Sequence, residues 1–151
     1  MFDRDDDEYY MGLALAEARQ AAARGEIPVG AVVVGRGHIL GRGHNLTEAL
    51  KDVTAHAEML AISAAAQKMK GKYLSDCTLY VTVEPCPMCA GAIGWSQLRR
   101  IVIGADDPKR GYSGILRPGC SFFHPRAEVI RGVLAEPCAA LMKEFFSKRR
   151  K

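Results

Sequence analysis

The chain has 151 residues, 48% of them hydrophobic and 25% charged, with a formal net charge of +4. This length and composition suit one globular domain over residues 1–151, which buries about two-thirds of its unfolded surface on folding. No apolar run approaches the roughly 18 residues of a membrane span, and the acidic N-terminus argues against a secretory signal. The odd number of cysteines, five, excludes a fully paired disulfide framework and leads us to expect a reduced protein in the cytoplasm.

The first part of the chain predicts a helix, a β-hairpin and a second helix. Apolar residues recur at helical spacing over about 6–24, which predicts the first helix. An apolar run of strand length at 29–34, followed by a glycine-rich turn and a partner strand at 39–41, predicts the hairpin. Thr54 suits the N-cap of an Ala-rich helix over 55–70.

The second part predicts strands that alternate with helices. A strand at 78–83 leads into a helix from Cys86, and a strand at 100–104 follows. A loop-rich stretch at 105–125 precedes a short strand at 128–130. The last helix carries an apolar stripe that we expect to be mainly core, although one of its phenylalanines could wall a substrate site: Cys138, Leu141, Met142, Phe145 and Phe146. The order αββαβαβ(β)α indicates one α/β domain with helices on both faces of a sheet.

Two short motifs carry the chemistry. Residues 54–58 read Thr-Ala-His-Ala-Glu, and residues 85–89 read Pro-Cys-Pro-Met-Cys. A structural zinc site normally has four protein ligands, whereas a catalytic site has three and leaves the fourth position to water. No further Cys or His stands near either motif in the sequence. The pattern therefore predicts one catalytic zinc ion per chain, with three candidate ligands, His56, Cys86 and Cys89.

Both motifs fall where helices are expected to begin. The positive partial charge of a helix N-terminus lowers the pKa of a thiol and favours anionic ligands. Cys86 and Cys89 are close to one helical turn apart, so both sulfurs can face one ion. Glu58 follows His56 by two residues, or about 200° around a helix, which disfavours ligation by both side chains. We therefore expect Glu58 beside the metal as a proton shuttle.

Each motif alone has other interpretations. Two cysteines three residues apart occur in zinc knuckles and redox pairs, and a single His-x-Glu is common by chance. Together and in this order, with prolines beside the cysteines, they form the signature of the zinc deaminases of nucleobases.

Further short words along nearly the whole chain point in the same direction. They are Ile27–Val32, His44–Leu46, Thr54–Glu58, Glu84–Ala92, Gly104–Lys109, Gly132–Leu134, and Phe145-Phe146 followed by Lys148–Arg150. In these words the chain resembles the bacterial tRNA-specific adenosine deaminases, in the zinc-dependent cytidine and deoxycytidylate deaminase superfamily.

The resemblance implies a cytidine-deaminase-like three-layer α/β/α sandwich with a five-stranded mixed sheet, usually as a homodimer without membrane attachment. It implies conversion of adenosine to inosine at the wobble position of a tRNA anticodon stem-loop. Matching positions would make Glu58 the acid/base and the three candidate ligands the zinc shell. Asn45 would hydrogen-bond the purine, and Asp107 would lie at the ribose. Lys109 and the basic C-terminal helix would approach the RNA backbone.

Some words depart from the family. Val53 stands where a proline is common, and residues 94–97 read Gly-Trp-Ser-Gln where a Ser-Arg pair is frequent. The family's Ser-Leu-Met loop and its Asn-His-Arg are replaced within residues 105–126. Words around Trp95 also resemble bacterial guanine deaminases. Two alternatives thus stand beside the tRNA enzyme, namely a deaminase of a free purine or nucleoside such as guanine, and a non-catalytic zinc module that binds RNA. A glutamate beside an open metal position argues against the second.

Overall fold

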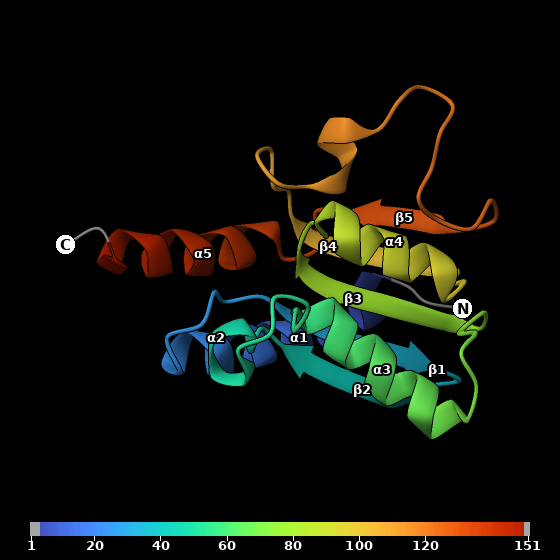
Figure 1. Cartoon of the computed structure of the whole chain (residues 1–151), viewed down its shortest axis with the longest axis horizontal. Coiled ribbons are helices and arrows are strands. Elements are labelled where there is room, and N and C mark those ends of the chain that lie inside the picture. The colour runs from blue at the N-terminus through green and yellow to red at the C-terminus, as the bar shows by residue number, and fades with distance from the viewer. Residues whose placement is uncertain (1–3, 150–151) are drawn as a thin grey trace.

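A computed structural model describes residues 4–149, and it has one five-stranded mixed sheet between helices (Figure 1). The strand order is β2-β1-β3-β4-β5. In chain order the elements are α1 (Arg4–Ala23), β1 (Gly30–Gly35), β2 (His38–His44), α2 (Thr47–Leu50), α3 (Ala57–Met69), β3 (Cys77–Val83), α4 (Pro87–Trp95), β4 (Arg100–Ala105), the 3-10 turn η1 (Tyr112–Ile115), β5 (Glu128–Arg131) and α5 (Ala135–Arg149).

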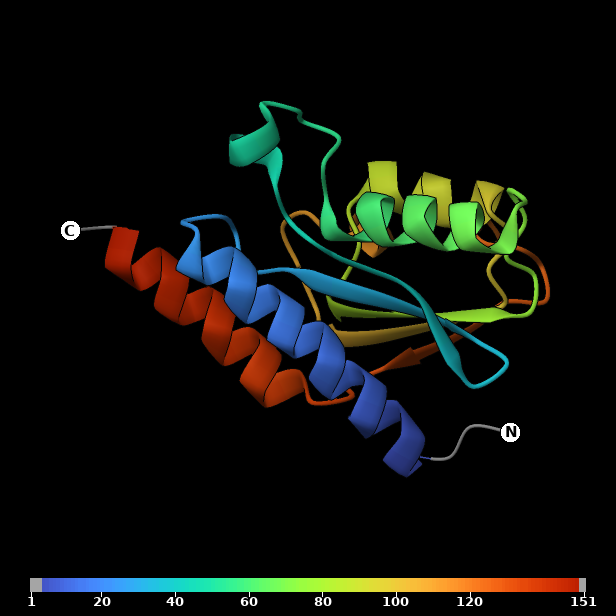
Figure 2. The ribbon, with the colours of Figure 1, turned by 90° about the horizontal axis from the view of Figure 1, so that it is seen from below.

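The pairing of the strands makes the sheet mixed. β1 is antiparallel to both β2 and β3, whereas β3, β4 and β5 run parallel to one another. Helices α3 and α4 cover one face of the sheet, and α1 and α5 lie side by side on the other (Figure 2). The predicted three-layer α/β/α sandwich with a five-stranded mixed sheet is thereby confirmed.

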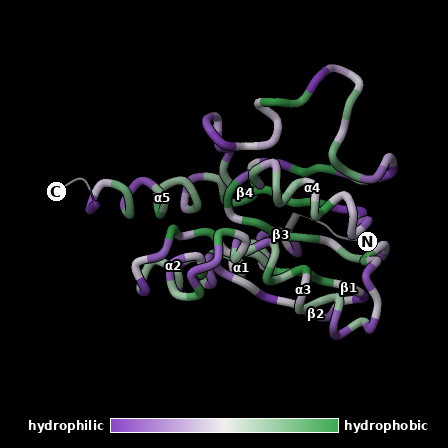
Figure 3. Tube along the Cα trace, viewed as in Figure 1, coloured by the Kyte–Doolittle hydropathy of each residue, from purple (hydrophilic) through white to green (hydrophobic). Residues whose placement is uncertain are grey.

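The core has two halves because successive side chains of a strand point to opposite faces. Towards α3 and α4 the central strands contribute Ala31, Val33, Leu79, Val81, Ile101 and Ile103. Towards α1 and α5 they contribute Val32, Val34, Tyr80 and Val102. Strands that are covered on both faces are rich in apolar residues, and Figure 3 shows β3 and β4 as mostly hydrophobic segments.

The helix that carries the first motif lies unusually close to the sheet. A Cβ atom at Gly43 would lie 2.5 Å from the carbonyl oxygen of Ala57, and one at Gly41 would lie 2.3 Å from that of Ala61. A side chain at either position would push α3 off β2. The two glycines therefore set the position of the start of α3.

The predicted N-cap of this helix is wrong. The helix begins at Ala57 and its N-cap is His56, which has extended backbone angles. Thr54 instead lies in a turn, where both its backbone N–H and its hydroxyl donate to the Asp52 carboxylate, at 2.8 and 2.7 Å. The predicted helix from Cys86 is confirmed, since Cys86 is the N-cap of α4 and Pro87 is its first residue.

Two short elements were not predicted. α2 has four residues, and η1 lies within the predicted loop of residues 105–125. The carboxylate of Glu26, which is buried, accepts hydrogen bonds from the backbone N–H groups of Glu48 and Ala49 at 3.0 and 2.8 Å. A cap that comes from more than 20 residues away leaves no local signal in the sequence.

Within residues 4–149, no helix combines the length and apolar character needed to cross a bilayer.

Candidate zinc site and catalytic cavity

The three predicted ligands meet where α3 and α4 begin. His56 and Cys86 are the N-cap residues of the two helices, and Cys89 lies in the first turn of α4. The three candidate ligand atoms all lie within 4.8 Å of one another, and no other such group of three occurs in the part of the chain that the structure describes.

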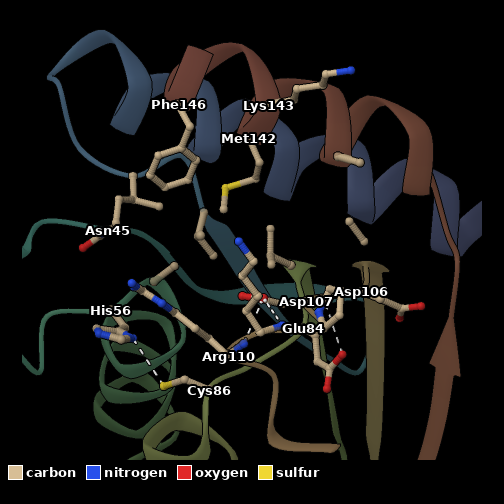
Figure 4. Close-up of a pocket in the computed structure, with 18 of the residues that line it drawn as sticks. Asn45, His56, Glu84, Cys86, Asp106, Asp107, Arg110, Met142, Lys143 and Phe146 are labelled. Carbon is tan, nitrogen blue, oxygen red and sulfur yellow. Dashed lines mark hydrogen bonds between the residues drawn. The ribbon is translucent and has the colours of Figure 1, made fainter. Parts of the chain in front are cut away.

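The spacing of these atoms fits a tetrahedral zinc ion. The Nδ1 atom of His56 lies 3.7 Å from the sulfur of Cys86 and 3.5 Å from that of Cys89 (Figure 4). Zinc bonds of about 2.3 Å to sulfur and about 2.0 Å to nitrogen, at tetrahedral angles, place such atoms about 3.6 Å apart. One imidazole and two thiolates form the donor set of a zinc site that leaves one position open.

The two thiols differ in proton affinity. The hydrogen bond from Cys89, supported by His56, lowers the pKa of Cys86 to about 4 despite partial burial. The same hydrogen bond and burial raise the pKa of Cys89. The pair thus shares one proton, and zinc binding must release it because only thiolates ligate the metal.

Glu58 lies one residue into α3 and points towards the same site. It is only 3% exposed, and burial raises its pKa to about 7. A carboxyl group with a pKa near the working pH both accepts and donates a proton readily, which is what a general acid/base requires. Glu58 is not among the three grouped ligand atoms, in agreement with its predicted place beside the metal.

A cavity of about 1090 Å³ opens over this cluster. Its walls come from the loop before α2, the starts of α3 and α4, the turn after β4 and one side of α5 (Figure 4). All of the residues that the resemblance assigned to the substrate line it together with Glu58: Asn45, Asp107 and Lys109. The structure therefore brings the predicted metal, catalytic and substrate residues into one cavity, while their roles stay predictions.

Asn45 is buried, and its side chain is partly engaged. Its Oδ1 atom accepts the backbone N–H of Thr47 at 3.0 Å, which shapes the loop that leads into α2. One acceptor position of the carbonyl oxygen is therefore used within the loop, and both N–H groups of the amide are left for a ligand.

The carboxylate of Asp107 is also only partly engaged within the protein. Its Oδ1 atom accepts the backbone N–H groups of Lys109 and Arg110, at 3.2 and 3.0 Å, and so closes a tight turn. Among residues 6–149, whose side chains the structure describes, its other oxygen, Oδ2, has no hydrogen-bond partner. Asp107 thus both shapes the turn and leaves one carboxylate oxygen for the cavity.

Several cavity residues were expected elsewhere or not assigned to the site from the sequence. Phe146 was expected mainly in the core, with a place in the substrate wall as the alternative, and it is 38% exposed and lines the cavity with Met142 and Lys143 from the same helix. The apolar stripe of α5 was predicted, but only the fold decides which part of it faces the cavity. Glu84 and Arg110 also line the cavity, and nothing in their local sequence indicated this.

The basic C-terminal end is less available for RNA than the sequence suggested. Lys148 pairs with Glu144 at 3.1 Å, one helical turn away. Arg149 donates to the carbonyl oxygen of Gly25 and lies over the ring of Phe145, 4.6 Å from its centroid. The last two basic residues, 150 and 151, lie outside the described residues.

Known proteins resemble the chain in sequence and in fold. The family model of the cytidine and deoxycytidylate deaminase zinc-binding region matches residues 4–105. The tRNA-specific adenosine deaminase of Bacillus subtilis is 47% identical over 147 residues, which cover 96% of this chain and 91% of that protein.

Solved structures of deaminases share the fold of this chain. A deaminase studied for A-to-I editing at the wobble position of transfer RNA superposes with a TM-score of 0.81 and 40% identity, covering 88% of this chain and 98% of the other. The guanine deaminase of Nitrosomonas europaea superposes with a TM-score of 0.76 and 30% identity, covering 93% and 84%. The chain belongs to the cytidine and deoxycytidylate deaminase zinc-binding family, and it is a zinc-dependent deaminase.

Proposed function

We propose that the chain converts adenosine to inosine at the wobble position of a tRNA anticodon stem-loop. The observation that carries this proposal is the single cavity that His56, Cys86 and Glu58 line together with Asn45, Asp107 and Lys109. The near full-length similarity to tRNA-specific adenosine deaminases supports the choice of substrate. The proposal assigns the whole chain, residues 1–151, to one catalytic domain.

Hydrolytic deamination needs an activated water and a proton shuttle. Zinc, when bound by His56, Cys86 and Cys89, supplies a water that is acidic enough to act at neutral pH. Glu58 accepts one proton of the attacking water, whose oxygen bonds to the carbon that carries the amine, and passes this proton to the adjacent ring nitrogen. Glu58 then takes the proton of the new hydroxyl group and gives it to the amine, so that the carbon–nitrogen bond breaks, the carbonyl forms and ammonia leaves. General acid/base catalysis of this kind contributes about 10²- to 10⁴-fold.

The substrate residues have distinct proposed roles. The free amide NH₂ of Asn45 donates to an acceptor on the purine edge, while its carbonyl oxygen accepts the backbone N–H of Thr47. The free oxygen of Asp107 accepts a ribose hydroxyl of the extruded nucleotide. Lys109, which is exposed beside it, lies near the RNA backbone. An anticodon base is already in a loop, so its extrusion costs less than opening a duplex.

The dimensions of the cavity favour a nucleotide within RNA over a free base. Pockets for small ligands commonly measure about 300–1,000 Å³, and this cavity, at about 1090 Å³, is slightly larger than that range. Phe146 and Met142 add an apolar wall on which neighbouring bases can stack.

A free purine such as guanine is the second candidate substrate. The similarity in fold to a guanine deaminase supports it, as do Trp95 and the departures within residues 105–126. The third candidate, a zinc module without catalysis, gains no support, because such a module has no need of a buried carboxyl group with a pKa near 7 beside an open metal position.

We also propose a homodimer that acts in the cytoplasm. The side chain of Trp95 is 85% exposed, and Met88, on the same side of α4 two turns earlier, is 38% exposed. A large apolar residue that is exposed to this degree supports burial against a second copy. Sedimentation of the wild type and of Trp95→Glu tests this proposal, because an interface over α4 predicts a dimer for the first and a monomer for the second.

Inosine mapping in tRNA incubated with the purified protein, beside ammonia release from free purines, tests the proposed activity. We expect inosine at the wobble position alone. Ammonia from guanine with no inosine in tRNA would replace the proposal with the second candidate.

A further inference from the structure

The turn after β4 directs one arginine into the cavity. Asp107 closes this turn by accepting the backbone N–H of Arg110 at 3.0 Å. In Figure 4 the side chain of Arg110 extends from the turn towards the side of the cavity on which His56 lies. Its guanidinium group therefore faces the space between the metal ligands and the residue proposed to bind the ribose.

The nearby carboxylates interact with groups other than Arg110. Nη1 of Arg131 lies 2.8 Å from Asp106 Oδ1 and 3.3 Å from Glu84 Oε1. Oδ1 of Asp107 is held by two backbone N–H groups. These three carboxylates on the β4 side of the cavity thus have partners other than Arg110.

The cations that line the cavity have no such partners. Lys109, Arg110 and Lys143 all line it, from two different walls. None of the three forms an ion pair with a side chain of residues 6–149. The cavity consequently presents three cations that are held by no ion pair among the described side chains, which suits an anionic ligand.

The backbone that carries Arg110 is fixed on both sides. Glu84 accepts the backbone N–H and the hydroxyl of Ser113, at 3.0 and 2.5 Å, and the backbone N–H of Asp107 at 3.3 Å. A Cβ atom at Gly111 would lie 2.3 Å from this carboxylate, so only glycine fits there. The guanidinium thus projects from a fixed turn, which lowers the entropy lost when it binds a ligand.

We propose that Arg110 binds the phosphodiester next to the target nucleotide with its two terminal nitrogens. Guanidinium groups recognise phosphate in this bidentate manner. The assignment rests on the proposed function, in which Asp107 lies at the ribose, since the phosphate joined to that ribose is then within reach of a residue three positions further on. A free purine has no phosphate, so Arg110 separates RNA from free bases as a specificity-determining residue.

The test compares Arg110→Ala and Arg110→Lys with Arg117→Ala, a matched control. Arg117 is an exposed cation of the same divergent segment that does not line the cavity. With an anticodon stem-loop, we expect Arg110→Ala to lower kcat/KM and weaken Kd roughly 10-fold at low salt, the loss of one charged hydrogen-bonded contact. The slope of log Kd against log salt should flatten by about 0.7, the value for one phosphate of a single strand. Values of kcat/KM and Kd for Arg110→Lys should lie between those of the wild type and Arg110→Ala. Arg117→Ala should match the wild type in both.

A substrate change identifies the phosphate itself. Methylphosphonate, which removes one charge, is placed in turn at each phosphate that flanks the target adenosine. At one of these positions the modification should weaken binding to the wild type about as much as Arg110→Ala weakens binding of the unmodified stem-loop. The same modification should cause no further loss of affinity in Arg110→Ala. This non-additivity is the signature of a direct contact.

Failure of this inference is distinct from failure of the proposed function. A wild type that does not deaminate the stem-loop would remove the proposed function and the phosphate contact together. A wild type that is active, with an Arg110→Ala variant equal to it or with fully additive methylphosphonate effects, would overturn the contact alone.

Discussion

The carboxylate of Glu84 lies 3.3 Å from the guanidinium of Arg131. This ion pair joins the residue after β3 to the last residue of β5. The two strands are parallel to β4 between them, so their carboxyl ends lie at the same edge of the sheet. The motif with the two cysteines follows Glu84 directly, and the turn with Asp107 donates to Glu84. The metal site and the substrate wall are thus fixed to one buried carboxylate.

We expect Glu84→Gln to lower the free energy of unfolding by about 2 kcal/mol, because buried donors lose an ionised acceptor. The KM for the stem-loop should rise as the turn after β4 loosens, whereas the zinc content should stay at one per chain. Asp106→Asn is the matched control, since its carboxylate pairs with the same arginine but is 70% exposed and should contribute less than about 0.5 kcal/mol. Equal effects of both variants in urea unfolding and kinetics would contradict this role of Glu84.

Cys86→Ala should abolish tight zinc binding, because two protein ligands do not hold the ion as three do. Cys120→Ala is the control, since its thiol is exposed and lies outside the ligand group. Metal analysis of the purified proteins should find one zinc per chain in the control and well below one in Cys86→Ala. Undiminished zinc in Cys86→Ala would show that the ligand assignment is wrong.

Glu58→Ala should retain zinc and fold but lose at least about 10²-fold in kcat, as expected when a general acid/base is removed. Metal analysis, circular dichroism and single-turnover kinetics measure the three properties. Loss of zinc in this variant would make Glu58 a ligand and not a proton shuttle. Unchanged turnover would contradict the mechanism just as directly.

A buried ion pair at the opposite edge of the sheet predicts acid sensitivity. Arg100 donates to both oxygens of Asp7 at 2.7 Å, and the Tyr80 hydroxyl donates to Asp7 at 2.8 Å. Burial alone would raise the pKa of Asp7, but these hydrogen bonds outweigh it and the pKa lies below its usual value. The pair therefore contributes stability above about pH 4, the pKa in the unfolded chain, and this contribution is lost as the pH falls through the folded value.

The measurement is urea unfolding from pH 7 to pH 3 for the wild type, Asp7→Asn and Glu128→Gln. The stability difference between the wild type and Asp7→Asn should be large at pH 7 and should narrow below about pH 4. Glu128, the more exposed partner of the same arginine, should show a small difference throughout. A constant gap between the wild type and Asp7→Asn would contradict the lowered pKa.

The sequence predicted the sheet and the metal site because their signals are local. Apolar runs of strand length locate β1, β3 and β4, and the ligands lie within two words of five residues each. A helix start brings Cys86 and Cys89, which are close in sequence, together in space without help from distant contacts. His56 lies on another helix, and it could be named as a ligand without a structure because the two motifs together form the zinc-deaminase signature.

The features that the sequence did not predict depend on distant partners. α2 is capped by Glu26, and the side chain of Thr54 turns to Asp52 in place of capping α3. Arg149 docks on the turn after α1, which withdraws one charge from the basic end. Nothing beside Arg110 in the sequence indicates that its side chain reaches the cavity, because the direction of the turn is set by Glu84.

The central claim is that a tRNA anticodon is the substrate, and one comparison tests it most directly. It measures kcat/KM for an anticodon stem-loop with a wobble adenosine against guanine, adenosine and cytidine, with the same zinc-loaded protein. We predict efficient turnover of the stem-loop and turnover of the three small molecules that is lower by at least about 10²-fold, since they lack the phosphate and neighbouring-base contacts. Efficient turnover of guanine, or of any free base or nucleoside, with none on the stem-loop would contradict the substrate while leaving the fold and the zinc site as described.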